Sequence, residues 1–192
     1  DAAGRASVLL SPGAYAEARV IDVSLEQAGA GQETDRALHD PRGRGVQTGA
    51  TLPDRAVLHV GTASPPVRVR PLDRSGGPVR HVRLTTPEPL PWHVGDPAIL
   101  RDPGDRRLWS VRVLDVDPLP LRRRGAAIRR AEELAGPGSP SDTRLRSRSA
   151  EHPLVLARLG LPDPDLAERV GSWWVHPDAL GRWQEALVRT VR

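Results

Sequence analysis

The sequence predicts a chain that is mainly β at first and α+β afterwards: a six-stranded antiparallel β-barrel followed by a winged-helix module. The first observation is an alternation of apolar and polar residues with period two, in short segments between Ser7 and Asp117 that Pro and Gly separate. The second is a change beyond Asp117, where apolar residues recur at helical spacing. The third is composition, since 38% of the 192 residues are hydrophobic, which is enough for a packed core.

Each expected strand of the barrel has one apolar side. In 18–25, for example, Ile21, Val23 and Leu25 fall on one face. The six strands are expected at 18–25, 55–63, 66–72, 79–84, 98–101 and 108–115, after a short strand at 7–10. Because no helical pattern interrupts them, they favour a small antiparallel barrel. Residues 26–54 are rich in Gly and polar residues, and we expect a loop insertion there.

The second half is expected to form a module with a core of its own. Residues 118–125 are rich in Pro and Arg and predict an exposed linker, and a helix at 126–136 should end at Gly136 and Pro137. The pattern predicts a loose or partly helical stretch at 136–149, a helix at 152–160 and a hairpin at 166–176 around Gly171 and Ser172. In the last helix one face holds Leu180, Trp183, Leu187, Val188 and Val191. This order favours a winged-helix-like domain over 126–192.

Composition excludes several classes of chemistry. The chain has no Cys and no Lys, which excludes disulfides, thiolate metal sites, a Cys nucleophile, a Lys Schiff base and a phosphate-loop Lys. The six His show no metal-type spacing, and no group of residues predicts a catalytic site. No apolar run is long enough to span a bilayer, so we expect no membrane partner and a cytoplasmic location. Since the chain lacks Met and begins at Asp1, we expect a piece of a longer protein.

Two basic clusters are candidates for binding a polyanion. Arg101, Arg106 and Arg107 surround the polar turn 102–107, which also contains Gly104. Arg122, Arg123 and Arg124 precede the helix at 126–136, an order opposite to the one that the helix dipole favours. The alternative for each cluster is that the arginines are simply solvated, and for the linker we favour this alternative about two to one because exposed charges contribute little. Trp173 and Trp174 could stack on bases, but we favour a core position for at least one of them.

The stretch "VGDPAILRDPGDRRLWSVRVLDVDPLPLRRRGAA" resembles the end of the third domain of the selenocysteine-specific translation elongation factor family. The segments "LPDRAVLHVGTASPPVRVRPL" and "PLPWHVGDPAILRDPG" are similar to that domain as well, and "RLGLPDPDLAERVGSWWVHPDALGRW" is similar to the winged helix that follows it. The resemblance implies that residues 1–12 end a preceding barrel like domain II. Residues 13–117 would then form a barrel like domain III of elongation factor Tu, followed by the linker 118–125. The sequence departs from the family in a longer insertion at 26–54 and in Pro97, where relatives more often have Arg.

The resemblance implies that the parent protein delivers selenocysteinyl-tRNA to the ribosome at UGA codons. This chain would bind tRNA and link to distal winged helices, absent here, that read an mRNA hairpin. GTP and Mg²⁺ would belong to a GTPase domain outside this chain, so we expect no cofactor and no catalytic activity here. By position, the implied tRNA contacts are Arg55, His59, Thr62, Arg101, Gly104, Arg106 and Arg107. The alternative is a barrel and winged helix that bind nucleic acid or a protein as a regulator with no role in translation.

Overall fold

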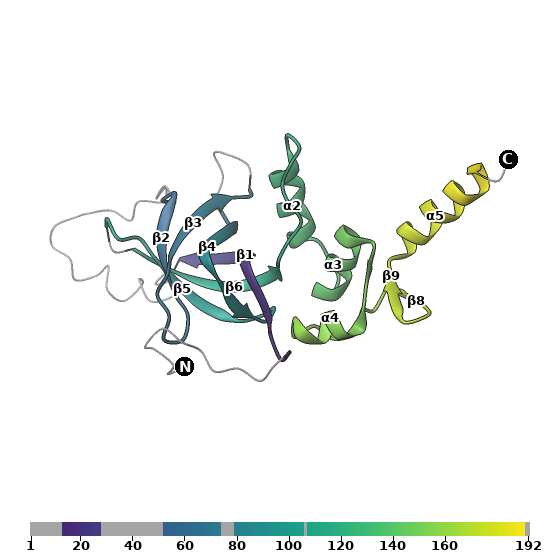
Figure 1. Ribbon diagram of the computed structural model, residues 1–192. Helices are drawn as coiled ribbons and strands as arrows, with labels where there is room; N and C mark the ends of the chain where they lie inside the picture. The colour runs from purple at the N-terminus through teal and green to yellow at the C-terminus, as the bar shows by residue number, and fades with distance from the viewer. Residues whose placement is uncertain (1–12, 28–51, 74–78, 106, 191–192) are drawn as a thin grey trace.

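A computed structural model describes residues 13–27, 52–73, 79–105 and 107–190, and the structural statements below refer to these residues. Six antiparallel strands close into a barrel in the order β1–β4–β3–β2–β5–β6 (Figure 1). They are β1 (Ala16–Gln27), β2 (Arg55–His59), β3 (Pro66–Pro71), β4 (His81–Trp92), β5 (Pro97–Arg101) and β6 (Leu108–Val116). The predicted six-stranded barrel is confirmed. The short strand expected at 7–10, the segment 1–12 and most of the insertion at 26–54 lie outside the described residues.

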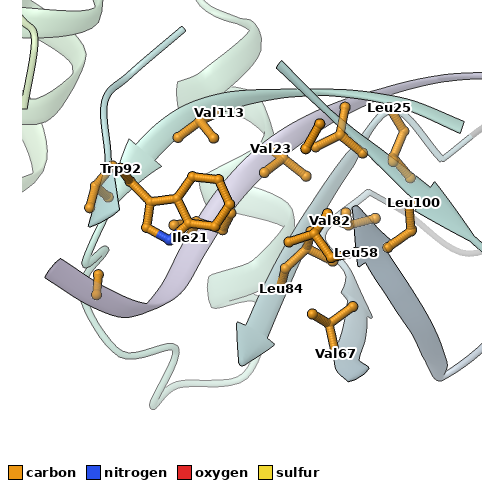
Figure 2. Packing of buried hydrophobic residues seen from close by; sticks show 14 of the residues in the cluster. Ile21, Val23, Leu25, Leu58, Val67, Val82, Leu84, Trp92, Leu100 and Val113 are labelled. Atoms are coloured by element: carbon orange, nitrogen blue, oxygen red, sulfur yellow. The ribbon is translucent and has the colours of Figure 1, made fainter. Parts of the chain in front are cut away.

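Alternation along the strands creates the barrel core. Every second side chain of β2, β3 and β5 is buried, and the residues between them are exposed or half-buried. Figure 2 shows the inward side chains of the barrel strands meeting in one cluster, with Trp92 beside Ile21 and Val113. Ala, Val and Leu fill most of this core, as they must in a chain without Phe or Met.

The strand β4 is longer than the sequence predicts. The expected strand ends at residue 84, before a segment with three Pro residues, but β4 continues to Trp92. The pairing with β1 shifts there, since Val20 lies opposite Thr85 whereas Ala18 lies opposite Leu90. Extra residues in β4 therefore bulge out of the ladder, where Pro is tolerated because no ladder hydrogen bond is sacrificed.

The second half of the chain is an α+β module. It contains α2 (Ala126–Ala135), α3 (Pro140–Arg148), β7 (Ala150–Glu151), α4 (Pro153–Arg158), β8 (Glu168–Val170), β9 (Trp173–Val175) and α5 (Pro177–Thr190). The three short strands form a sheet in the order β7–β9–β8. Gly171 in the β8–β9 turn has φ of 60°, a left-handed conformation that Gly adopts without strain. Helices followed by this small sheet agree with the predicted winged-helix-like module.

The segment 136–149, predicted to be loose or partly helical, contains the regular helix α3. Ser139 and Asp142 form a reciprocal capping box, in which the Ser139 hydroxyl accepts from the Asp142 backbone N–H at 3.2 Å and the Asp142 carboxylate accepts from the Ser139 backbone N–H at 3.4 Å. The Ser139 hydroxyl also donates to the same carboxylate at 2.6 Å. Pro140 occupies the first turn, where its missing N–H costs nothing. The letters Ser-Pro-Ser-Asp already contain this start signal.

The apolar core of the barrel extends into the module through three leucines near α4, whereas other buried apolar residues of the module, such as Leu145 and Val175, lie outside this cluster. Leu156 and Leu159 of the α4 region, with Leu161, belong to the same cluster as the barrel residues. The backbone N–H of Val94 donates to the carbonyl of Leu159 at 2.8 Å, which joins the loop after β4 to the end of α4.

Candidate nucleic-acid interface

The two halves of the barrel wall differ in what lies outside them. The strands β4, β1 and β6 are neighbours in the closed sheet, and ion pairs to α2 and α3 reach Asp22 of β1 and Asp115 of β6. The strands β3, β2 and β5 are neighbours on the other side, and Figure 1 shows β2 and β5 on the side of the barrel away from α2, α3 and α4, while the end of β3 approaches α2. The helices therefore cover the β4–β1–β6 half of the barrel wall and reach the end of β3, and they leave the outer surface of β2, β5 and the start of β3 uncovered.

Four arginines lie on the outward surface of β3–β2–β5. Arg55 of β2 pairs directly across from Arg68 of β3, and Arg70 lies two residues further along β3 on the same side. Arg101 of β5 lies opposite Val57, which places it diagonally from Arg55. Such diagonal neighbours are about 7–8 Å apart, within reach of long side chains. We call Arg55, Arg68, Arg70 and Arg101 the cationic face.

Among the described residues, no carboxylate compensates the positive charge of the cationic face. Within the described part of the chain, none of its four arginines forms a hydrogen bond or an ion pair through its side chain. Like charges directly opposite one another in a sheet destabilise it, so the pair Arg55–Arg68 is unfavourable in the free protein. A bound anion would relieve this repulsion, and guanidinium groups suit phosphate because they donate in a planar fork.

Two further predicted residues lie near this surface. His59 occupies the next outward position of β2 after Val57, and its Nδ1 lies 2.9 Å from the Ser64 hydroxyl. Thr62 is exposed in the turn that follows, between the bridged residues Val60 and Ala63. His59 is thus tied to its own turn, while Thr62 is accessible to a ligand.

The turn between β5 and β6 is organised by its own acids. The Asp102 carboxylate accepts from the backbone N–H of Gly104 at 2.8 Å, and Asp102 N–H donates to the Arg107 carbonyl at 2.9 Å. Arg107 forms an ion pair with Asp105, and this hydrogen-bonded partner lowers the pKa of the Asp105 carboxyl and raises that of Arg107. Arg107 therefore has an acidic partner within the turn, and Arg106 lies outside the described residues.

The linker arginines are a separate exposed group. Arg122, Arg123 and Arg124 are all exposed and precede Gly125, the residue before α2, which has φ of 76°. No ion pair involves them in the part of the chain that the structure describes. They remain candidates for an anion contact, with solvation as the simpler interpretation.

Sequence reasoning misses Arg68 and Arg70. The letters Val-Arg-Val-Arg at 67–70 predict a strand, but they do not by themselves single out its arginines as a site. The same alternation places both arginines on one face, outward because Val67 and Val69 are buried. Their register with Arg55 becomes known only when the strands are paired.

Two kinds of site find no support among the described residues. No group of three or more His, Asp or Glu side chains there is arranged to hold a metal ion. None of the described helices has the length and apolar character needed to cross a membrane.

Comparison with known proteins gives a structural match only. No protein-family model and no curated protein matches the sequence. Among solved structures, the chain is similar to the crystal structure of the bacterial selenocysteine-specific elongation factor EF-Sec, with a TM-score of 0.65 and 12% sequence identity. The match covers 94% of this chain and 28% of that one, so the chain corresponds to little more than a quarter of that protein's length. A barrel followed by a winged-helix-like module is thus a fold that occurs within this elongation factor.

Proposed function

We propose that this chain is the barrel and winged-helix part of a selenocysteine-specific elongation factor and that its cationic face binds the phosphate backbone of a tRNA stem. The observation that carries the proposal is the group of four unpaired arginines on the open half of a barrel of this fold, within the part of the chain that the structure describes. The structural similarity to EF-Sec supports the link to translation, since it extends over 94% of the chain. Selenocysteinyl-tRNA, the ribosome and the cytoplasm would then be the partners and the location of the whole protein.

The chemistry of the cationic face favours a duplex over a single strand. Proteins that bind single-stranded nucleic acid stack successive bases on aromatic side chains. The described outward residues of β2, β3 and β5 include no Phe, Trp or Tyr. Arginines without a stacking platform fit contacts to the backbone of an A-form stem, which position RNA without reading its sequence.

The proposal is tested by measuring RNA affinity at several salt concentrations. Each phosphate contact that is lost makes the dependence of log K on log salt shallower by about 0.7 to 0.9 units, so Arg55→Ala with Arg68→Ala should flatten it by roughly 1.4 to 1.8 units. The probes are an RNA hairpin with a tRNA T-stem and a second hairpin with the same stem length and another sequence. The double variant should bind both hairpins more weakly than the unaltered chain does, and by the same factor, because contacts to the RNA backbone do not depend on the base sequence.

Arg129→Ala is the matched control, because Arg129 is an exposed arginine of α2 without an ion pair among the described residues. It should leave the slope unchanged. If the double variant and the control give the same curves, the cationic face does not bind RNA. If a duplex DNA of unrelated sequence binds more tightly than either RNA hairpin, the regulator without a role in translation becomes the better explanation.

A further inference from the structure

A buried ionic cluster joins the barrel to the helical module. Asp22 of β1 and Asp115 of β6 lie directly opposite each other in the sheet, and they are 0% and 4% exposed. Two carboxylates so placed would repel each other strongly in a dry environment. They persist because guanidinium groups from three different elements surround them.

Arg130 of α2 bridges both carboxylates. Its Nε donates to Asp22 at 2.8 Å and its Nη2 donates to Asp115 at 2.5 Å. Burial alone would lower the pKa of Arg130, but the attraction of Asp115 and the hydrogen bond to Asp22 raise it above its usual value. One residue of α2 thus holds two strands of the barrel at once.

Two further arginines complete the arrangement. Arg83 of β4 donates to Asp22 at 2.7 and 3.0 Å and to the carbonyl of Leu119 at 2.8 Å, which fixes the start of the linker. Arg144 of α3 donates to Asp115 at 2.7 Å and to Glu151 of β7 at 2.8 Å. Together Asp22, Arg83, Asp115, Arg130, Arg144 and Glu151 form the junction cluster, with three positive and three negative groups.

The junction cluster restricts the angle between the two parts. Guanidinium–carboxylate pairs require a planar geometry, so a rotation of α2 or α3 against the barrel would break several short hydrogen bonds and leave buried charges unpaired. The same rotation would also disrupt the packing of the shared apolar core beside α4.

The last helix lacks such attachments. Ala179 is its only buried residue in the described range, whereas Trp183 and Leu187 are 44% and 66% exposed. A hydrogen bond from Arg182 to Ser149, at 3.4 Å, ties it to the rest of the module. Figure 1 shows α5 extending from β9 away from the barrel.

We propose that the barrel and the module up to β9 move as one rigid body whose angle the junction cluster fixes, and that the joint that permits motion lies just before α5. The linker 118–125 then does not act as a hinge between the barrel and the module. A ligand on the barrel and one on the β8–β9 hairpin would stay at a fixed distance, and only elements at α5 and beyond would change direction. This inference does not depend on which ligand the barrel binds.

Distances between pairs of spin labels test the proposal directly. The chain has no Cys, so introduced cysteines are its only labelling sites. Ser110→Cys with Arg146→Cys spans the junction from β6 to α3, and Ser110→Cys with Gln184→Cys spans the joint before α5; all three positions are exposed. The first pair should give one narrow distance distribution, and the second a broad one.

Arg130→Lys is the decisive variant, because an ammonium keeps the charge but cannot bridge two carboxylates in a planar fork. It should broaden the distribution of the first pair, while Arg129→Lys, the exposed neighbour, should leave it narrow. Far-ultraviolet circular dichroism must show that the variant is still folded, and if it is not, Arg144→Lys replaces it. A broad distribution for the first pair in the unaltered chain would overturn the proposal. A narrow distribution for the first pair in folded Arg130→Lys would also overturn it. A narrow distribution for the second pair in the unaltered chain would do the same.

Discussion

Single residues of the same type have opposite roles in this chain. Arg70 and Arg83 lie directly opposite each other on β3 and β4. Arg83 is 7% exposed and bonded to Asp22, whereas Arg70 is exposed and without a carboxylate among the described residues. What separates them is the position of the helices on the barrel wall, since Arg83 lies beneath the linker and α2 and Arg70 does not. The number of arginines therefore says little about which ones are available to bind a polyanion.

Asp142 is the residue at which we expect pH to affect stability. Burial would raise the pKa of this carboxyl, but hydrogen bonds from the Ser139 hydroxyl and from backbone N–H groups, including that of Leu166, lower it below its usual value. A lowered folded-state pKa means that the stabilisation is complete above the unfolded value of about 3.9 and is lost as pH falls through the folded value. Asp142→Asn should lower the free energy of unfolding at pH 7 by about 1 kcal/mol, as removal of a helix cap does.

Urea unfolding between pH 7 and pH 2.5 measures this effect. The difference between the variant and the unaltered chain should shrink at the acid end, because protonation of Asp142 removes the negative charge that strengthens its hydrogen bonds. Asp54→Asn, at an exposed carboxylate, serves as the control and should follow the unaltered chain at every pH. A difference that stays constant down to pH 2.5 would show that the Asp142 charge is not what stabilises α3.

At the scale of elements, the β5–β6 hairpin separates two arginines that the sequence places together. Arg101 belongs to the cationic face, whereas Arg107 is paired with Asp105 inside the turn and lies 6.0 Å from the Trp109 ring. Arg101→Ala should therefore weaken binding of an RNA stem and flatten its salt dependence by about one unit. Arg107→Ala should change neither the affinity for the RNA stem nor its salt dependence appreciably, because Arg107 is already paired with Asp105. Filter binding at several salt concentrations measures both variants. A larger effect of Arg107→Ala than of Arg101→Ala would mean that the RNA binds at the turn.

The individual strands and helices differ in how well the sequence predicts them. Period-two alternation identifies the barrel strands, because one side of each packs on Val and Leu. It ends β4 too early, since Pro87 and Pro89 hide a strand that continues through a bulge. The helix α3 is underestimated because its charged residues obscure any apolar stripe, although its capping box is visible in the letters.

The cationic face is predictable only in part. Arg55 and Arg101 are candidates through resemblance, whereas their proximity to Arg68 depends on the pairing of β2 with its two neighbours. The junction cluster is beyond sequence reasoning, because Asp22 meets Arg130 from 108 positions away. Nothing local marks Asp22, because period-two alternation expects a polar residue between Ile21 and Val23 on the outward face of the strand.

For the whole molecule, the shared core and the junction cluster imply one cooperative unit rather than two tethered ones. An isolated barrel would expose apolar side chains that now pack against Leu156 and Leu159, and it would leave Asp22 and Asp115 with only Arg83 beside them. Breaking a buried ion pair by removing one partner costs about 3–5 kcal/mol, which is a large share of the stability of a typical domain. Neither part is thus expected to unfold while the other remains folded.

This cooperativity predicts the result of cutting the chain in the linker. If a recognition site for a specific protease is inserted as an added flexible loop between Arg123 and Arg124, both exposed, cleavage should be efficient, but the two fragments should stay together in gel filtration. Denaturant should then unfold the nicked protein in one transition, because both pieces depend on the same buried charges and the same apolar cluster. Arg130→Met with the same nick should weaken the association, whereas Arg129→Met should not. Separation of the fragments after cleavage without denaturant, or two well-resolved transitions in the uncut chain, would mean that the barrel and the module are stable apart and that the ionic junction contributes little to holding them.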